Sequence, residues 1–562
     1  MCIRDAFAKQ SKLSSWRLEQ IVFKMSEKCM DFNEFLPYIG EFGAYQKRLL
    51  LYMMPFAFMF AFIYLAQIFM LLVPKNHWCR IQELEGLPKA KQMELGIPKN
   101  ADGVYERCSM YDVDFKLHSN ATTANESWPT TKCRDGWMYD KSQVPYETIS
   151  TQYNWVCQKD DYVSYAIAAG FVGSIFGCLS IGYVADHWGR IPALFLANAC
   201  ALAGGLLSAA CTNFYTFAAA SVLQGWSYDT CFTSIYILMM ETVGPQYRTL
   251  TANLSLATFY TVGACVLPWI AYACNGWRTF AVVTSVPIII LILMCLIIPE
   301  SPRWLLSVGK IEKGLKIIRK ISKNNGKTVP EDVLIAFQQC SEVAYHEEQL
   351  AKKYTLLEIF KSCRMGRIVL ILILNWMIIA LVYDAHVRII TNVGTDIFIS
   401  FSLANLAELP GGLVPLVLMD RTGRKIMLFT VLLLCSICSL LASLLTKEWD
   451  IAIAAIFGRL CVTIAYNVGE QWAAEILPTV VRGQGLSLIH ILGAAAAVLS
   501  PFVVYSSDYS SSLPMKILAG LAVIGAVLVL FLPETTNVAL PQTIEEAETR
   551  WQQKCWFRKK KL

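Results

Sequence analysis

Five ionisable side chains lie inside long apolar stretches of this sequence: Asp229, Asp384, Glu408, Arg459 and Glu470. A charged side chain at the centre of a bilayer costs about 2.5–3.5 kcal/mol on insertion scales, so such residues are candidates for binding charged ligands or for relaying protons. Four acids against one base predict a site of net negative charge. Such a site suits an ammonium ligand, through ion pairing and contact with aromatic rings.

The acids also have simpler interpretations, which the sequence leaves open. Asp384 lies in the outer half of its stretch, where it could be solvated. Glu408 could be a structural or conformational residue, and Glu470 lies near a stretch end, where it could join a gating ion pair. Asp229 is about a dozen residues from the nearest expected interface, which favours a substrate or proton role.

The composition predicts a membrane scaffold for these residues. Hydrophobic residues make up 55% of the 562 residues and charged residues 16%, against roughly 25% charged residues in soluble domains. Each apolar stretch has about the 20 residues that cross hydrocarbon. We therefore expect twelve helical spans, at approximately 49–73, 162–184, 191–211, 214–240, 250–274, 278–298, 367–389, 396–419, 426–446, 450–474, 485–506 and 514–532.

A constant spacing of 234 residues relates the two halves of the chain. Each repeated residue follows an apolar stretch, so the chain is expected to be an all-α membrane protein of two homologous six-helix halves. Halves of this kind rock about a central site in transporters. The residues Asp186, Gly189, Arg190, Glu241, Arg248, Pro299 and Glu300 recur as Asp420, Gly423, Arg424, Glu475, Arg482, Pro533 and Glu534.

The repeated loop residues predict a pair of gates. Glycine permits a tight turn between antiparallel helices, and the neighbouring arginine can bind a carboxylate at another helix end. Glu241 and Glu475 are the expected partners. We expect these cytosolic ion pairs to hold an outward-open state and to break on switching, with Arg482 beside Glu475 as a further member. A purely topological role is the alternative.

The spans and loops divide the chain into five segments. Basic residues cluster on one side of the spans, which the positive-inside rule makes cytosolic, and an even number of spans places both termini there. The linker is expected to form short charged helices at 311–322 and 331–352. The segments are a cytosolic stretch 1–48, a first half 49–298 with a large extracellular loop 74–161, a cytosolic linker 299–366, a second half 367–532 and a cytosolic basic tail 533–562.

The loop at 74–161 has the features of an oxidising, extracellular compartment. It contains two glycosylation sequons, at Asn120 and Asn125. An even set of cysteines allows two disulfides, whose pairing the sequence leaves open. These cysteines are Cys79, Cys108, Cys133 and Cys157.

Several independent motifs resemble one known family. The Asp-x-x-Gly-Arg loops are similar to those of the major facilitator superfamily. The organic cation/carnitine/organic anion transporter family shares further motifs, over about residues 30 to 550. They are Phe35-Leu-Pro-Tyr-Ile-Gly-Glu-Phe42, Cys133-Arg-Asp-Gly-Trp137, Trp155-Val-Cys157, Pro299-Glu-Ser-Pro-Arg-Trp304 and Leu532-Pro-Glu-Thr535.

The resemblance implies roles for some residues and shows where the chain departs from the family. Trp376, Tyr383, Glu408, Arg459 and Asn467 match cavity-lining positions. The charge that usually separates cation from anion carriers is absent, because Ala494 occupies its position. At the position of Asp229, cation-carrying relatives typically have a lysine. Asp384 and Glu470 likewise lack usual acidic counterparts.

We therefore predict a multi-pass plasma-membrane transporter of small organic cations or zwitterions that works by alternating access. Its expected partners are the substrate, the bilayer and a coupling proton or sodium ion. The alternative is a carnitine-type or organic anion porter with Arg459 as the substrate ligand. No nucleotide-binding loop, catalytic constellation or metal-ligand spacing stands out, so we expect no enzyme activity, cofactor, metal or nucleic-acid partner.

Overall fold

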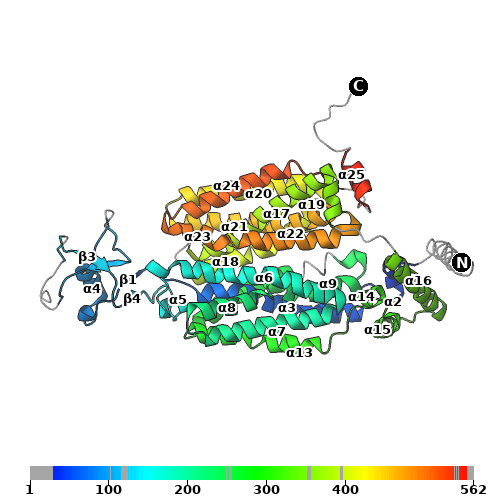
Figure 1. Ribbon diagram of the computed structural model, residues 1–562, viewed down its shortest axis with the longest axis horizontal. Coiled ribbons are helices and arrows are strands. Elements are labelled where there is room, and N and C mark those ends of the chain that lie inside the picture. The colour runs from blue at the N-terminus through cyan, green and yellow to red at the C-terminus, as the bar shows by residue number, and fades with distance from the viewer. Residues whose placement is uncertain are drawn as a thin grey trace, which may run out of the picture.

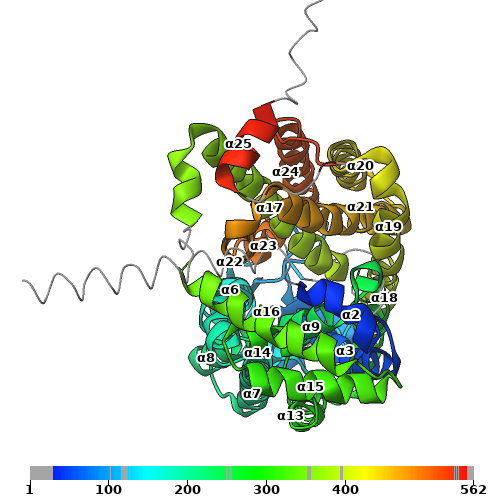
Figure 2. The same cartoon turned by 90° about the vertical axis from the view of Figure 1, so that its right-hand side faces the viewer.

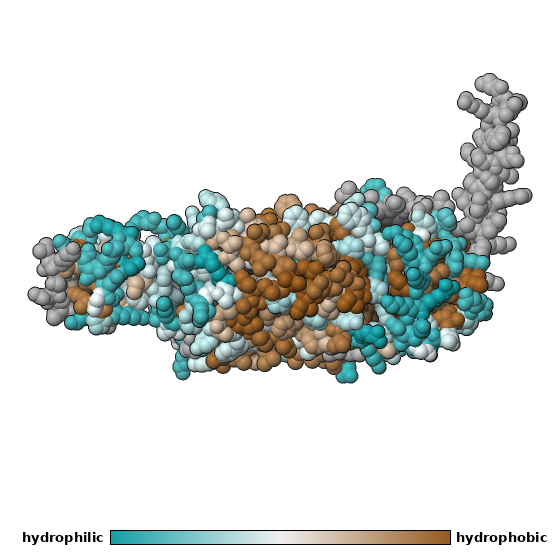
Figure 3. Space-filling model, turned by 90° about the horizontal axis from the view of Figure 1, so that it is seen from below, coloured by the Kyte–Doolittle hydropathy of each residue, from teal (hydrophilic) through white to brown (hydrophobic). Residues whose placement is uncertain are grey.

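The computed structural model is an elongated, mainly helical molecule (Figure 1). On the face shown in Figure 3, hydrophobic residues form a band across the middle of the molecule, between two polar ends. One end is formed by the loop after the first long helix, and the other by the helices that join the halves (Figure 1); we call them the loop end and the linker end. The structure describes residues 30–100, 103–115, 124–125, 127–248, 251, 256–350, 356–392, 396–536, 538, 541 and 543–552.

Nine helical stretches in these described ranges are long and apolar enough to cross a membrane. They contain α3 (Ala44–Met70), α6 (Asp161–His187), α7 (Arg190–Ala210), α12 (Trp277–Ser285) with α13 (Ile288–Cys295), α17 (Cys363–Ile389), α18 (Ile397–Leu406) with α19 (Glu408–Thr422), α20 (Arg424–Leu444), α21 (Glu448–Ile476), and α22 (Arg482–Ala497) with α23 (Ser500–Tyr505).

Three further expected spans have shorter apolar helices. The π-helical turn η3 (Leu256–Tyr260) leads into α11 (Thr261–Ala273), and α24 (Leu513–Val529) lies near the C-terminus. The expected span 214–240 is divided into α8 (Phe214–Gly225) and α9 (Thr230–Thr242) by a turn at 226–229. That interruption places Asp229 at the N-cap of α9 instead of inside a continuous helix.

The loop end is a small separate unit held by two disulfides. The structure pairs Cys79 with Cys133 and Cys108 with Cys157. Asn125 is exposed there, and the second sequon residue, Asn120, lies outside the described residues. The elements are β1 (His77–Cys79), η1 (Gln82–Leu84), α4 (Lys89–Gly96), β2 (Ser109–Tyr111), β3 (Thr130–Lys132), β4 (Trp137–Tyr139), α5 (Ile149–Gln152) and η2 (Cys157–Lys159), with β1 antiparallel to β4 and β2 to β3.

The linker end consists of short helices around the N-terminal segment (Figure 2). Phe35 stacks on Phe337 with ring centroids 4.1 Å apart. Asn325 accepts a bond from the backbone N–H of Tyr45 at 2.8 Å and donates to the carbonyl of Ile39 at 2.8 Å. The linker is thus attached to the N-terminal half through α2 (Phe32–Ile39), α14 (Pro302–Ser307), α15 (Ile311–Asn324) and α16 (Glu331–Leu350). The remaining described elements are η4 (Leu356–Lys361), η5 (Ile390–Asn392), η6 (Thr479–Val481), η7 (Ser506–Asp508) and α25 (Ile544–Gln552).

The two halves meet at the loop end and form separate cores toward the linker end. One buried cluster joins N-terminal residues such as Phe69 to Phe398 and Phe401 of α18. The other buried cluster contains C-terminal-half residues such as Met365 and Trp472 and no residue of the first half. At the loop end the hydroxyl of Tyr505 also donates to Asp160 across the interface, at 3.0 Å. The halves are therefore closed together at the loop end.

Close packing between α6 and α8 depends on glycine. A Cβ atom at Gly177 would lie 1.9 Å from the carbonyl oxygen of Trp226, and one at Gly173 would lie 2.1 Å from that of Val222. Gly182, in the same helix, has nothing within 4 Å of its hypothetical Cβ. Backbone oxygens cannot move aside as flexible side chains do, so these helices approach each other only because small residues line α6.

We predict that Gly177→Ala lowers the melting temperature of the purified protein, whereas Gly182→Ala leaves it unchanged or raises it. Both changes remove a helical glycine, which favours the helix by about 1 kcal/mol. Only Gly177→Ala adds an overpacking cost of about 1–3 kcal/mol. Intrinsic-fluorescence unfolding in detergent measures the difference, and equal melting temperatures would contradict the packing.

Candidate functional site

Arg459 and Glu408 form a buried ion pair inside the second half. The guanidinium of Arg459 in α21 binds the carboxylate of Glu408 at the start of α19, and the exposed fractions of the two side chains are 1% and 9%. Arg459 also donates to the carbonyl of Tyr383 at 3.1 Å and lies 4.0 Å from the centre of its ring. The Tyr383 hydroxyl donates to Glu408 at 3.0 Å. Both charges are therefore satisfied by neighbouring protein groups.

Asp384 is paired as well, by an arginine that the sequence analysis missed. Arg388 lies one turn further along α17 and binds the Asp384 carboxylate at 2.7 Å, with exposed fractions of 6% and 1%. Asp384 also accepts bonds from Ser500 and, across the two halves, from Tyr64 at 2.8 Å. The proposal that Asp384 is solvated is wrong. The spacing of four residues, which places two side chains on one helix face, could have revealed the pair.

Asp229 is the intramembrane acid without a basic partner among the described residues. Its carboxylate accepts a bond from the Ser174 hydroxyl at 2.7 Å and lies 3.6 Å from the thiol of Cys178. The side chain is half-buried. The break between α8 and α9 thus leaves a carboxylate with hydrogen bonds but no counter-charge.

Glu470 lies two turns before the end of α21. Its side chain is 51% exposed, and it lies 3.9 Å from the basic group of His490. The alternative in which Glu470 joins Glu475 and Arg482 is wrong, because Arg482 donates to the Leu477 carbonyl and to Thr479.

The charge count changes once the structure is known. Four carboxylates and two guanidiniums leave a net charge of −2 at membrane depth, because Arg388 joins Arg459 as a second base. The two uncompensated charges belong to Asp229 and Glu470. The negative site predicted from the sequence stays a prediction, and two acids instead of four lack an arginine partner among the described residues.

Aromatic rings of the second half pack against one another near Glu470. The ring of Tyr466 lies 4.8 Å from that of Trp376 and 4.9 Å from that of Tyr383, and Trp376 lies 5.3 Å from His490, the neighbour of Glu470. The sequence analysis missed Tyr466 and His490, because aromatic residues in apolar helices usually only pack. We call Trp376, Tyr383, Tyr466, His490 and Glu470 the central cluster.

Two other predicted residues lie outside the central cluster. The amide of Asn467 donates to the carbonyls of Thr463 at 2.9 Å and Gly411 at 3.4 Å, so backbone groups hold it. Ala494 lies in α22 and contributes no charge.

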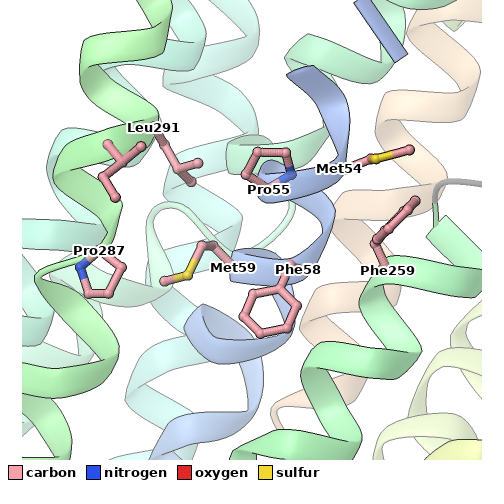
Figure 4. Close-up of a pocket in the computed structure, with 8 residues that line it drawn as sticks. Met54, Pro55, Phe58, Met59, Phe259, Pro287 and Leu291 are labelled. Carbon is pink, nitrogen blue, oxygen red and sulfur yellow. The ribbon is translucent and has the colours of Figure 1, made fainter. Parts of the chain in front are cut away.

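A separate apolar pocket lies between α3, η3 and α13 (Figure 4). Its volume is about 390 Å³. Only carbon and sulfur side chains of Met, Pro, Phe, Ile and Leu line it, and no titratable group reaches it. A charged ligand would lose its hydration there without compensation, so this pocket is not the candidate site.

The repeated loop residues form equivalent ion-pair networks in the two halves. Arg190 binds Glu241 at 2.9 Å and Asp186 at 3.2 Å. Arg424 binds Glu475 at 3.0 Å and Asp420 at 2.9 Å. Gly189 and Gly423, at φ +117° and +86°, form the turns that precede these arginines, a backbone region that favours glycine.

A second carboxylate fastens each turn. Glu300 accepts bonds from the backbone N–H groups of Arg190 and Ile191, and Glu534 accepts them from those of Arg424 and Lys425, all at 3.0–3.2 Å. Burial alone would raise the pKa of Glu534, but hydrogen bonds from Thr536 and these N–H groups lower it below 4.5. The carboxylates thus compensate the exposed N–H groups of the helix starts.

These networks differ from the predicted gates in two ways. Both ion pairs join helices of a single half, and both are present while the halves meet at the loop end. Arg248 binds Asn33 at 2.7 Å instead of Glu241. Pairs that lie within one half can stay formed while rigid halves move, which is the alternative to pairs that break on switching.

Comparison with known proteins identifies relatives of this chain. A family model described as "Sugar (and other) transporter" matches residues 136–398 and 391–559. The carcinine transporter of Drosophila melanogaster is 30% identical over 93% of this chain and 80% of its own. The beta-alanine transporter of the same organism is 30% identical over 92% and 89%, and solute carrier family 22 member 1 of Bos taurus is 29% identical over 92% and 92%. The chain belongs to the organic cation/carnitine/organic anion transporter family.

Solved structures support the same fold. A proton:xylose symporter bound to 6-bromo-6-deoxy-D-glucose superposes with a TM-score of 0.58, at 16% identity over 90% of this chain and 99% of that chain. An inward-open xylose transporter from E. coli superposes with a TM-score of 0.61, at 14% identity over 90% and 100%. The protein is therefore a multi-pass membrane transporter of the major facilitator fold, as its loop motifs predicted.

The networks generate a prediction with an internal control. Glu475 and Asp420 bind the same guanidinium of Arg424, but their exposed fractions are 16% and 78%. Glu475→Gln should destabilise the transporter by about 1.5–3 kcal/mol, the range for hydrogen bonds to charged groups. Asp420→Asn should have almost no effect, because exposed ion pairs contribute little. Melting temperatures in detergent test this, and equal losses for both variants would refute it.

Proposed function

We propose that this chain carries small organic cations or zwitterions across the plasma membrane by alternating access, and that Asp229 binds the cationic group. The observation that supports this role is the absence of a basic partner for the half-buried carboxylate of Asp229 among the described residues. A carboxylate without a counter-charge favours ammonium groups through ion pairing. The carcinine and beta-alanine transporters, among the relatives, are named for small amines of this kind.

The proposed topology has twelve spans in two six-helix halves. It counts α8 with α9, α11 and α24 as spans beside the nine longer stretches. The disulfide-bonded unit then lies outside the cell, with Asn120 and Asn125 as glycosylation sites, and both termini lie in the cytosol. The domain boundaries predicted from the sequence are retained, including the linker at 299–366.

The proposed mechanism moves the two halves as rigid bodies. Closure at the loop end makes the present arrangement inward-facing. The ion pairs Arg190–Glu241 and Arg424–Glu475 keep each half rigid, while the contact of Tyr64 with Asp384 holds the outer side closed. Outward opening would break the Tyr64–Asp384 bond and leave the paired networks unchanged. A proton or sodium ion remains the proposed coupling ion, and the free carboxylate of Asp229 is its candidate binding group.

The alternative anion or carnitine porter would need Arg459 as a substrate ligand. Glu408 and the Tyr383 carbonyl already occupy its guanidinium, and its side chain is 1% exposed. An incoming carboxylate would have to displace Glu408 and leave that acid buried without a partner, which is strongly unfavourable. The geometry thus favours a transporter of cations over the alternative transporter of anions or carnitine.

We predict that Asp229→Asn reduces saturable uptake of radiolabelled tetraethylammonium at least tenfold, while Asp229→Glu retains part of it. The neutral amide keeps the size of the side chain but removes its attraction for the cation. Asp396→Asn is the matched control, because Asp396 caps α18 at the loop end and asparagine caps equally well.

Uptake would be measured in cells at two pH values and normalised to surface expression. Carnitine and a dicarboxylate would be tested beside the cation. Tetraethylammonium uptake that survives Asp229→Asn, or uptake confined to carnitine or the dicarboxylate, would contradict the proposal.

A further inference from the structure

Basic residues are concentrated in and around the linker helix α15. Residues 310–327 include seven lysine or arginine side chains and one acidic side chain, so this stretch has a net charge of +6, as large as that of the whole chain. Four of its lysines are spaced three, four and three residues apart, which places them on one helix face. All four are exposed, and within the described ranges none forms an ion pair. They are Lys313, Lys316, Lys320 and Lys323, and we call them the basic face.

The opposite face of α15 is buried against its neighbours at the linker end. Leu315, Ile318 and Ile321 are buried there, and α15 packs on α14, α2 and α16. A Cβ atom at Gly314 would lie 3.0 Å from the side chain of Leu306 in α14. This packing fixes the rotation of α15 about its axis, so the basic face points away from the body of the molecule.

Hydrogen bonds place α15 at the level where membrane spans begin and end. Asn325, directly after α15, accepts a bond at 2.8 Å from the backbone N–H of Tyr45, in the first turn of α3. Tyr45 is four residues, about 6 Å along the helix, before Leu49, where the apolar stretch begins. Trp304 of α14 donates to the backbone carbonyl of Asp186, near the end of α6, at 3.0 Å. The headgroup layer on each side of a bilayer is about 5–8 Å thick, so α15 lies at the depth of the headgroups.

The arrangement of the helices directs the basic face sideways. Seen along the long axis from the linker end, α15 lies at the outer edge of the first half, and α2, α14 and α16 lie on its inner side (Figure 2). The same three helices lie to one side of α15 in Figure 1. In the view from below, hydrophilic residues of the linker end border the hydrophobic band (Figure 3). The exposed side of α15 is thus directed toward the lipid around the first half.

We propose that the basic face of α15 binds anionic phospholipid headgroups, such as those of phosphatidylserine, in the leaflet at the linker end. Clusters of about four to eight lysines or arginines next to a span attract anionic lipids. From the proposed function this inference uses only the topology in which the linker is cytosolic, because the cytosolic leaflet contains the anionic lipids. Since α15 is attached to the first half, bound lipid holds that half at a fixed depth while the second half moves.

The simpler alternative is that the basic face is only solvated. Arg319 of the same helix shows that state, because it pairs with Glu331 at 3.4 Å while both side chains stay mostly exposed. A solvated face would not distinguish anionic from zwitterionic lipids, and removing its charges would not change lipid binding. The two interpretations therefore differ in the lipid preference of the wild-type protein and in the effect of neutralising the four lysines.

The test titrates the purified full chain in detergent with phosphatidylserine or phosphatidylcholine that have the same acyl chains, and counts bound lipids by native mass spectrometry. The wild-type chain should bind phosphatidylserine about tenfold more tightly than phosphatidylcholine. Changing all four lysines of the basic face to glutamine should remove this preference and leave phosphatidylcholine binding unchanged. Changing the same four lysines to arginine should retain the preference, because the charges are kept.

The matched control removes the same number of charges at the loop end and should retain the preference. Its four exposed lysines, each changed to glutamine, are Lys91, Lys132, Lys141 and Lys159. Lys320→Gln alone should weaken phosphatidylserine binding about two- to fivefold, so poor folding of the quadruple variant would not prevent a decision.

Two results would overturn the inference: equal binding of the two lipids by the wild-type chain, or equal losses of phosphatidylserine binding in the basic-face and loop-end variants. None of these measurements involves transport. A chain that fails to carry tetraethylammonium but prefers phosphatidylserine would refute the proposed function and support the role of α15, and the reverse result would do the opposite.

Discussion

The cost of placing charge at membrane depth is the constraint on which this structure depends. Four carboxylates lie among the spans, and each must be neutralised or must remain accessible. Asp384 is neutralised by Arg388 on the same helix face, and Glu408 by Arg459 from a neighbouring helix. In the described residues, the two arginines at that depth, Arg388 and Arg459, are thus both paired. Asp229 and Glu470 have no arginine or lysine partner among the described residues.

The same constraint acts differently at the membrane surface. At the linker end, carboxylates and arginines are half-buried and bind both each other and the N–H groups of helix starts. Their positions within one half, together with the glycine contacts of α6, make each half resist deformation. At the interface between the halves, Tyr64 binds the buried Asp384.

Each buried pair thus has a second effect beyond neutralisation. The Asp384–Arg388 pair presents an acceptor to the first half, and the guanidinium lies 5.3 Å from the ring centre of Phe171 in α6. The Glu408–Arg459 pair orients Tyr383, whose ring packs on Tyr466. The paired charges therefore help to shape the interface between the halves. A buried polar network fixes one arrangement because any other would leave charges unpaired.

The sequence by itself determined the membrane class, the two related halves and the linker-end partners Arg190–Glu241 and Arg424–Glu475. The length of the apolar stretches, the constant spacing and the helix-end motifs are local or periodic properties, so they can be recognised in the sequence alone. The tertiary structure decided the disulfide pairing, the break before Asp229 and the identity of the acids that remain free. Those features depend on which helices are neighbours. Arg388 can be recognised in the sequence, but only the structure shows that it is paired with the buried Asp384, while Glu470 is half-exposed with no arginine partner among the described residues.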